Sequence, residues 1–126
     1  MYKLFNNMKN FKLGKYTIGK SNTLFLPDIS TFFDTNIEEA FNLIKKISDT
    51  GLNIVKGEIL HDIDVVLNTT LKEKFYNNID KKFYSENYRS LVNRKINTLK
   101  NYEKIFDYAK NLGLNLIFSV YDTTGV

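Results

Sequence analysis

The chain has 126 residues, a net charge of +4 and no cysteine. This length suits one domain or part of a larger one, and without cysteine there is neither a disulfide framework nor a thiolate metal site. Apolar residues make up 43% of the chain, but no apolar run approaches the roughly 20 residues that span a bilayer. The first ten residues contain three Asn and no apolar signal-peptide core. We therefore expect a cytoplasmic protein with no membrane partner.

The positive charge does not predict a nucleic-acid partner. Lysine supplies all but two of the 18 Lys and Arg residues, and these cations alternate with Asp and Glu. A nucleic-acid surface more often gathers Arg and aromatic residues on one face. The local excess at Lys81–Lys82 and from Arg89 to Lys100 indicates a solvated face.

The first predicted element is a hairpin. The polar residues 1–10 are expected to be loosely held. Residues 11–19, "FKLGKYTIG", contain two short β-prone runs around Gly14–Lys15, and glycine at the first turn position favours a two-residue hairpin loop. The next apolar run, Leu24 to Leu26, predicts a buried strand that ends near Pro27.

The stretch "TNIEEAFNLIKKISDTG" predicts the first helix. Thr35 and Glu38 have the spacing of a capping box, and Gly51 is expected to end the helix in a left-handed conformation. "LNIVKGEI" follows at once as the second strand. The apolar residues of the helix share one face: Ile37, Ala40, Phe41, Ile44 and Ile47.

The same order recurs near the C-terminus. Thr98 is expected to cap a second helix, Gly113 to end it, and "LNLIFSVY" to form a third strand whose uncharged centre suits burial on both faces. Such helix-to-strand repeats predict neighbouring parallel strands. The apolar face of this helix comprises Leu99, Tyr102, Ile105, Phe106, Ala109 and Leu112.

These elements together predict an α/β fold, the first three parallel strands of a (β/α)8 TIM barrel with an N-terminal β-hairpin. Residues 11–126 would be the N-terminal part of the barrel, with the hairpin at 11–19 and the barrel segment at 20–126. Three strands cannot close a barrel, so we expect a fragment of a longer protein. Residues 61–82 are predicted as loop with one helical turn, and "SENYRSLVNRKI" as a short helix. Long insertions after a strand are where β/α proteins build their sites.

Functional groups are expected at the C-terminal ends of the strands. Lys56 and Glu58 should share a face, because side chains alternate along a strand. The candidates in chain order are Asp28 on the first strand, Lys56 and Glu58 on the second, and Ser119, Tyr121 and Asp122 on the third.

Lys56 is the most informative candidate, because it interrupts an otherwise apolar strand. A buried ammonium is costly unless an anion accompanies it. One interpretation is a structural ion pair with Glu58 or Asp28, or a lysine that reaches out to solvent. The other is a cation that receives a phosphate or carboxylate group. Ser119 is either a small core residue or a donor to phosphate oxygens, and Asp122 either contacts substrate or caps a following helix.

His61 is the only histidine of the chain. Its place in "LHD" at a strand exit suggests a substrate contact or proton carrier, or a hydrogen-bonded loop residue. One histidine without a second nearby ligand does not indicate a metal. The sequence contains no glycine-rich phosphate loop, nucleotide fingerprint, zinc-ligand spacing or nucleophile elbow.

The order of these elements resembles the N-terminal portion of the sialic acid synthase (N-acetylneuraminate synthase) family. The stretches that carry the resemblance are "YTIGKSNTLFLPDIS", "NIEEAFNLIKKISDTGLNIVKGEI" and "NYEKIFDYAKNLGLNLIFSVYD". The resemblance implies a (β/α)8 barrel, usually followed by a small antifreeze-like domain. From Ser30 to Thr35 this chain reads "STFFDT", where the family usually has Gly-x-Asn-His-Asn-Gly.

The function that the resemblance implies is a step of carbohydrate biosynthesis, catalysed by a transferase. Phosphoenolpyruvate condenses with an N-acetylated hexosamine, which forms a nonulosonic acid and releases phosphate. Lys56 matches the family lysine that contacts phosphoenolpyruvate, and Ser119 matches a hydroxyl residue that also binds it. Asp28 stands where the family usually has glutamate, and Glu58 where it often has glutamine. These two carboxylates would orient the acceptor or assist proton transfer.

The resemblance also implies a divalent metal, manganese or magnesium, in the complete enzyme, with no ligand attributable to this chain. It allows a homodimer of the complete protein. Whether this chain alone is an enzyme stays open. The alternative is a truncated or decayed non-catalytic binding or assembly module that docks partners through an exposed sheet edge and aromatic residues: Phe32, Phe33, Tyr76, Phe83 and Tyr84.

Overall fold

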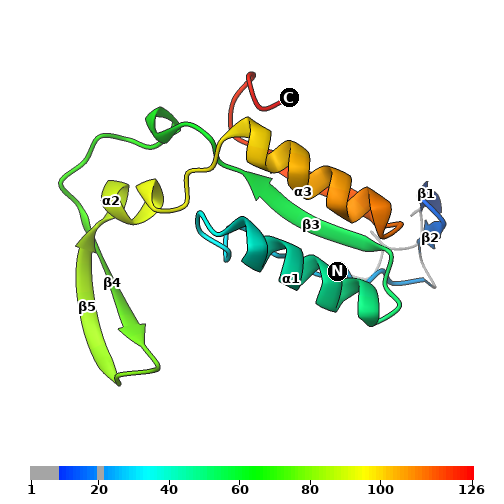
Figure 1. Ribbon diagram of the computed structural model, residues 1–126, viewed down its shortest axis with the longest axis horizontal. Coiled ribbons are helices and arrows are strands. Elements are labelled where there is room, and N and C mark those ends of the chain that lie inside the picture. The colour runs from blue at the N-terminus through cyan, green and yellow to red at the C-terminus, as the bar shows by residue number, and fades with distance from the viewer. Residues whose placement is uncertain (1–8, 20–21) are drawn as a thin grey trace.

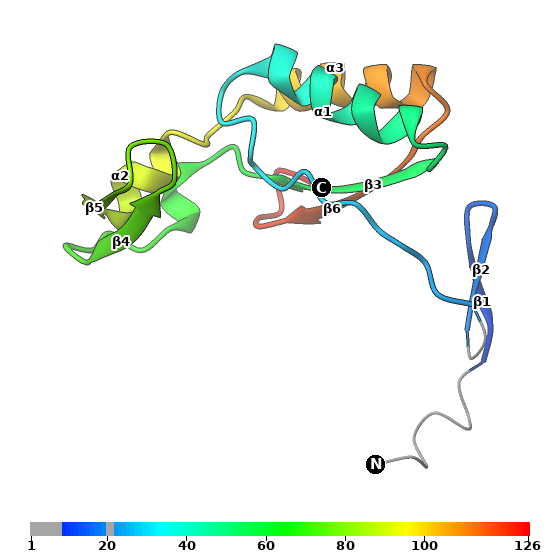
Figure 2. The ribbon, with the colours of Figure 1, turned by 90° about the horizontal axis from the view of Figure 1, so that it is seen from below.

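The computed structural model describes residues 9–19 and 22–126. Its central unit consists of two helices and two parallel strands (Figure 1). The helices α1 (Ile37–Asp49) and α3 (Leu99–Asn111) lie side by side on one face of the strands β3 (Ile54–Ile59) and β6 (Asn115–Val120) (Figure 2). The chain therefore has a mixed α/β fold, as the sequence predicts. Of the polar N-terminus expected to be loosely held, residues 1–8 lie outside the described part.

The start of α1 differs from the prediction by one residue. Asn36, not Thr35, caps the helix, and its side-chain oxygen accepts a hydrogen bond from the amide of Glu39 at 3.3 Å. Asn36 has the extended backbone that an N-cap requires, with φ −87° and ψ 95°, whereas Thr35 still belongs to the preceding turn. The predicted capping box is therefore wrong, although the helix itself is confirmed.

The other predicted helix boundaries are confirmed. Thr98 caps α3, and its hydroxyl accepts from the amide of Asn101 at 3.2 Å. Gly51 and Gly113 follow the two helices with φ of +81° and +74°. This left-handed conformation is strained for residues with a Cβ, so the two glycines let the chain turn directly from helix to strand.

The core fills the space between the helices and the strands. In β3, the side chains of Val55 and Ile59 point toward the helices, so the alternate residues point to the opposite face. Phe41 of α1 stacks on Tyr108 of α3 with ring centroids 4.5 Å apart. The fully buried residues of this core include Ala40, Ile44, Val55, Tyr102, Ile105 and Ala109.

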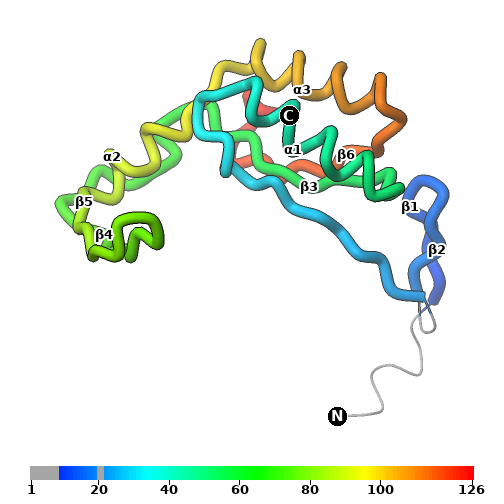
Figure 3. The backbone as a smooth tube through the Cα atoms, turned by 60° about the horizontal axis from the view of Figure 1, so that its bottom comes forward, coloured from blue at the N-terminus to red at the C-terminus, as the bar shows by residue number. Residues whose placement is uncertain are grey.

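The predicted strand at Leu24 to Leu26 is wrong. Phe25 is 72% exposed, and the described part of this segment pairs with β3 only through one parallel bridge, between Asp28 and Lys56. There the amide of Lys56 donates to the carbonyl of Pro27 at 2.8 Å, and the amide of Ile29 donates to the carbonyl of Lys56 at 2.9 Å. Figure 3 traces the described residues of this segment, 22–36, past β3 to the start of α1. An apolar run that remains this exposed gains too little burial to hold a longer strand.

The predicted N-terminal hairpin is confirmed. Strands β1 (Phe11–Leu13) and β2 (Tyr16–Ile18) pair antiparallel, and Gly14 between them has φ +57°. The hairpin meets the N-terminal ends of the parallel strands, where the Tyr16 hydroxyl accepts from the amide of Asn53 at 3.2 Å. This contact places the hairpin at the end of the sheet opposite the predicted site.

A second hairpin, absent from the sequence prediction, lies in the insertion after β3. The one helical turn predicted there is present (η2, Ile63–Val65), but strands β4 (Lys72–Asn77) and β5 (Lys82–Asn87) follow it and lead into the predicted short helix, α2 (Tyr88–Asn93). The turn between the strands uses Lys81 at φ +59°, so the usual glycine signal is missing. Cross-strand aromatic pairs stabilise the hairpin, which projects away from the central unit (Figure 1).

The aromatic residues proposed for partner docking do not all reach the surface. Phe32 and Phe83 are 73% and 78% exposed, and Tyr76 and Tyr84 are also exposed, but Phe33 is 2% exposed and belongs to the core. Phe33 is therefore wrong as a docking residue.

No helix among the described residues is both long and apolar enough to cross a bilayer.

Candidate functional site

The face of the strands opposite the helices carries four of the predicted site residues. Asp28 is in register with Lys56 of β3, and Glu58 is in register with Ser119 of β6. Residues in register on adjacent parallel strands point to the same side of a sheet. Because Val55 and Ile59 point toward the helices, Asp28, Lys56, Glu58 and Ser119 share the other face.

Lys56 lies at the centre of this face. Its Nζ is 2.6 Å from Oδ2 of Asp28 and 4.0 Å from Oε1 of Glu58, and its side chain is 28% exposed. The other oxygen of Asp28 accepts from the amide of Ser30 at 2.7 Å. The structure thus contains the ion pair with Asp28 that was one of the two interpretations of Lys56. An ammonium has three N–H donors, and among the described residues Lys56 donates one side-chain hydrogen bond, to the carboxylate of Asp28.

The ion pair between Lys56 and Asp28 shifts the pKa of each side chain so that its charged form is favoured. The hydrogen bond that Lys56 donates to Asp28 is the largest effect and raises the pKa of Lys56. Desolvation lowers this pKa, and the charges of Asp28 and Glu58 raise it further, so the net shift is upward. Burial by itself raises the pKa of Asp28, but the hydrogen bonds from Lys56 and Ser30 and the charge of Lys56 outweigh it and lower that pKa. At neutral pH the cation and the anion are both present.

Tyr121 extends this group of side chains. It follows β6 two residues after Ser119, and strand alternation puts it on the same side. Burial, together with the neighbouring carboxylate of Glu58, raises the pKa of the Tyr121 hydroxyl, so this group keeps its proton at neutral pH.

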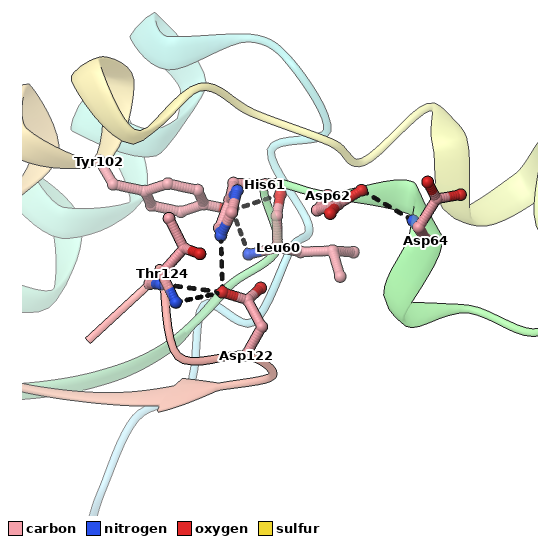
Figure 4. Close-up of polar contacts among 8 residues, drawn as sticks. Leu60, His61, Asp62, Asp64, Tyr102, Asp122 and Thr124 are labelled. Carbon is pink, nitrogen blue, oxygen red and sulfur yellow. Dashed lines mark hydrogen bonds and ion pairs between the residues drawn. The ribbon is translucent and has the colours of Figure 1, made fainter.

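His61 and Asp122 form a separate pair at the C-terminal edge of the strands (Figure 4). Nε2 of His61 is 2.9 Å from Oδ1 of Asp122, which also accepts from the amides of Thr124 and Gly125 at 2.8 and 2.9 Å. The hydrogen bond with His61 lowers the pKa of Asp122, and the two backbone amides add to this effect against desolvation. Asp122 organises a turn rather than a helix, and the pair ties the loop after β3 to the loop after β6.

Tyr102 holds the end of β3 against α3. Its hydroxyl accepts from the amide of Leu60 at 2.9 Å and donates to the carbonyl of Leu60 at 3.3 Å (Figure 4). The helical spacing of the apolar residues places Tyr102 on the buried face of the helix, and the structure confirms this. The spacing does not indicate the hydrogen bond to Leu60, which lies 42 residues away in the sequence. The contact fixes the residue that precedes His61.

A cavity of about 560 Å³ lies between the C-terminal ends of the strands and the insertion. Its polar side chains include Glu58 and Tyr121 from the strand face and Lys95 from the segment after α2. Nζ of Lys95 is 3.3 Å from Oγ1 of Thr31 and 3.8 Å from Oδ1 of Asp34. In the sequence, Lys95 shares one side of the predicted short helix with Leu91 and Val92, but this pattern does not indicate a pocket. The apolar walls include Leu60, Val65, Leu67, Leu71, Leu91 and Val92.

The described residues do not fit the divalent metal that the resemblance implies. Within the described ranges, no three His, Cys, Asp or Glu side chains are grouped so that they could hold an ion. His61 meets a single carboxylate, and Asp28 and Glu58 are both directed at a lysine. No step of a reaction is assigned to a metal for this chain.

No protein family and no curated protein matches the sequence. The structure is similar to that of the N-acetylneuraminic acid (sialic acid) synthetase from Leptospira borgpetersenii serovar Hardjo-bovis, which was solved in complex with citrate. The TM-score is 0.68 at 14% sequence identity, and the match covers 95% of this chain and 37% of that chain. In fold, the chain is therefore similar to a segment of a sialic acid synthetase and spans 37% of the length of that protein.

Proposed function

We propose that this chain is the phosphoenolpyruvate-binding part of a nonulosonate synthase-like enzyme, the N-terminal part of a (β/α)8 barrel. The observation that carries the proposal is the position of Lys56, on the strand face opposite the helices, between Asp28 and Glu58. In a (β/α)8 barrel this face lines the interior, and sites form at the C-terminal strand ends. The similarity in fold to a sialic acid synthetase supports the same assignment.

The role of Lys56 in this proposal is electrostatic. Its raised pKa keeps the ammonium charged at neutral pH, and its free donors can meet a phosphate or carboxylate oxygen. Ser119, on the same face, would add a hydroxyl donor. Asp28 competes for the ammonium, so the substrate would share Lys56 with it rather than meet an isolated charge. Such fixed donors and charges lower a barrier by positioning the reactants and stabilising developing charge.

The reaction joins the methylene carbon of phosphoenolpyruvate to the carbonyl carbon of an N-acylated amino sugar. Water adds to the carbon that bears the phosphate, the bond from this carbon to the phosphate oxygen breaks, and inorganic phosphate leaves. Glu58 and Asp28 are the groups that would orient acceptor hydroxyls or accept a proton.

Binding of phosphoenolpyruvate by the 126-residue chain tests this proposal. The backbone amides of a ¹⁵N-labelled chain are followed by NMR during titration with phosphoenolpyruvate, for the wild type, Lys56→Met and Lys45→Met. Lys45 is a matched control, because it also pairs with an aspartate, Asp49, but lies on the surface of α1. We expect the wild type and Lys45→Met to bind equally and Lys56→Met to bind at least about tenfold more weakly, since a hydrogen bond between charged groups is lost.

Circular dichroism checks that each variant is folded. Equal affinities in all three folded proteins would refute the role of Lys56. A folded wild type whose amide signals near β3 do not move at millimolar phosphoenolpyruvate would refute the proposed function.

A further inference from the structure

We propose that one face of the β4–β5 hairpin docks on the headgroup layer of a bilayer that contains anionic lipids. This lysine–aromatic face comprises Lys72, Lys74, Tyr76 and Phe83, and Ile79 lies in the turn that joins the two strands. The expectation of no membrane partner rests on the lack of an apolar run that could span a bilayer, and a hairpin that docks on the surface needs no such run. The proposal is independent of the proposed function, because the hairpin is separate from the strands that carry the candidate site.

The register of the hairpin gathers cations and aromatic rings on this face. Three directly opposed pairs point to the same side, because side chains alternate along a strand: Lys72–Asn87, Lys74–Ser85 and Tyr76–Phe83. None of these six residues is acidic. Among the described residues, neither Lys72 nor Lys74 takes part in an ion pair. The face therefore presents two exposed cations and no anion.

The carboxylates of the hairpin are directed to the opposite face. Glu73 and Glu86 form a cross-strand pair there, and Glu86 lies 2.7 Å from Nη1 of Arg94. Asp80, in the turn, accepts a hydrogen bond from the hydroxyl of Tyr84, and Tyr84 is on the same face as the two glutamates. This separation of charge leaves the lysine–aromatic face positive, which is complementary to the phosphate groups of anionic lipids.

The aromatic and apolar side chains of the hairpin are uncovered. The rings of Tyr76 and Phe83 contact each other, with centroids 5.0 Å apart, yet these residues are 44% and 78% exposed, and Ile79 is 93% exposed. The hairpin stands at one end of the molecule, away from the central unit (Figure 1 and Figure 2). Transfer of this apolar area from water into the outer part of a bilayer is favourable in proportion to the area buried.

The side chains of the hairpin distinguish a bilayer from a single-stranded nucleic acid, which also combines phosphates with surfaces for aromatic rings. A nucleic acid has no apolar layer that would cover Ile79, and nucleic-acid surfaces gather arginine, whereas both cations on the lysine–aromatic face are lysines. A bilayer offers headgroup phosphates to the lysines and hydrocarbon to Ile79 and Phe83. Tyr76 has an apolar ring and a polar hydroxyl, which suits the boundary between the two layers. The observations therefore favour the bilayer.

Sedimentation with vesicles tests the proposal. The full chain is mixed with vesicles of phosphatidylcholine alone or of phosphatidylcholine with phosphatidylglycerol, at low and high salt. We expect binding only to the anionic vesicles, and weaker binding at high salt, because ions screen the attraction. Lys72→Gln with Lys74→Gln should weaken binding about 30-fold, since each lysine near an anionic surface contributes about fivefold. The matched control is Lys100→Gln with Lys104→Gln, which removes the same charge from exposed positions of α3 and should bind like the wild type.

A tryptophan reporter tests the contact locally, because the chain contains no tryptophan. Phe83→Trp places the indole ring in the lysine–aromatic face. Phe25→Trp is the matched control, since Phe25 is 72% exposed but lies in the segment before α1. We expect the emission of Phe83→Trp to move to shorter wavelength on anionic vesicles and that of Phe25→Trp to stay unchanged. Ile79→Asn should weaken vesicle binding by about tenfold, because burial of the isoleucine side chain is lost.

Several results would overturn the proposal. No binding to either kind of vesicle, equal binding to both, or equal losses in the two double variants would show that the lysines of the hairpin do not direct the chain to anionic lipids. An unshifted emission of Phe83→Trp on vesicles that bind the chain would place the contact elsewhere. A shift with single-stranded oligothymidylate but not with vesicles would indicate a nucleic-acid partner, and a shift that depends on protein concentration alone would indicate a second copy of the chain.

Discussion

The ammonium of Lys56 and the carboxylate of Asp28 lie 2.6 Å apart, although 28 residues separate them in the sequence. A single parallel bridge aligns their backbones, and the resulting ion pair occupies the centre of the strand face opposite the helices. The same lysine that is proposed to meet a substrate anion therefore already has an anionic neighbour, which holds it in place and keeps it charged.

The first prediction concerns the pH dependence of stability. The folded-state pKa of Asp28 is lowered, so its contribution is present above the unfolded value of about 3.9 and is lost as pH falls through the folded value. The pKa of Lys56 is raised, so its contribution is present below about 10.4 and is lost as pH rises through the folded value. The pair should thus stabilise the fold between about pH 4 and pH 10.

Urea unfolding of the wild type and of Asp28→Asn measures this effect. We expect the wild type to have the higher free energy of unfolding at neutral pH, and the difference to shrink toward zero as Asp28 becomes protonated in acid. If the free energies of unfolding of the wild type and Asp28→Asn differed by the same amount at neutral and acidic pH, the charge of Asp28 would not contribute to stability.

The second prediction tests the cap of α1. Asn36→Ala removes the side chain that accepts from the amide of Glu39 and should lower the free energy of unfolding by about 1 kcal/mol. Thr35→Ala serves as the neighbouring control and should change it by less than about 0.5 kcal/mol. If Thr35→Ala had the larger effect in thermal or urea unfolding, the helix would begin one residue earlier, as the sequence suggests.

The third prediction concerns the hydroxyl of Tyr102. Tyr102→Phe leaves the buried amide of Leu60 without its partner at 2.9 Å and should cost about 1–3 kcal/mol of stability. Tyr108→Phe, in which the ring can still stack on Phe41, should cost less. Hydrogen exchange of the Leu60 amide provides a local readout, because only Tyr102→Phe should accelerate it relative to the rest of β3. Unchanged exchange would contradict the contact.

The fourth prediction concerns the close approach of Gly57 to Phe118. A Cβ at Gly57 would lie 2.6 Å from the Phe118 ring, which itself packs against Phe106 with centroids 4.8 Å apart. Gly57→Ala should therefore destabilise the fold by about 1–3 kcal/mol. In the double variant with Phe118→Leu, the smaller side chain should make room, so the two effects should not add. Additive free energies of unfolding would mean that the ring does not meet the new methyl group.

Local signals in the sequence were sufficient for the elements of the central unit. The apolar faces of α1 and α3, the cap at Thr98 and the glycines after each helix all act within a few residues. They also predicted that β3 and β6 are parallel, since a helix that leads back into a strand returns the chain in the same direction. The same-face arrangement of Lys56 and Glu58 follows from the two-residue period of a strand alone.

The remaining features depend on segments that are distant in the sequence. The run from Leu24 to Leu26 is apolar enough for a strand, but only the bridge at Asp28 reaches β3. The β4–β5 hairpin relies on cross-strand aromatic pairs, and its turn lacks a glycine signal. The sequence left either Glu58 or Asp28 as the ion-pair partner of Lys56, and the tertiary structure shows that Asp28 is the nearer of the two.

The sequence by itself determined the helices α1 and α3, the parallel strands β3 and β6, and the shared face of Lys56 and Glu58, because backbone periodicity is a local property. Only the tertiary structure decided that Asp28 pairs with Lys56, that His61 pairs with Asp122, and that the insertion borders an open pocket beside Glu58. Each of these depends on distances between segments that are far apart along the chain, and those distances are set by the packing of α1 and α3 on the two strands.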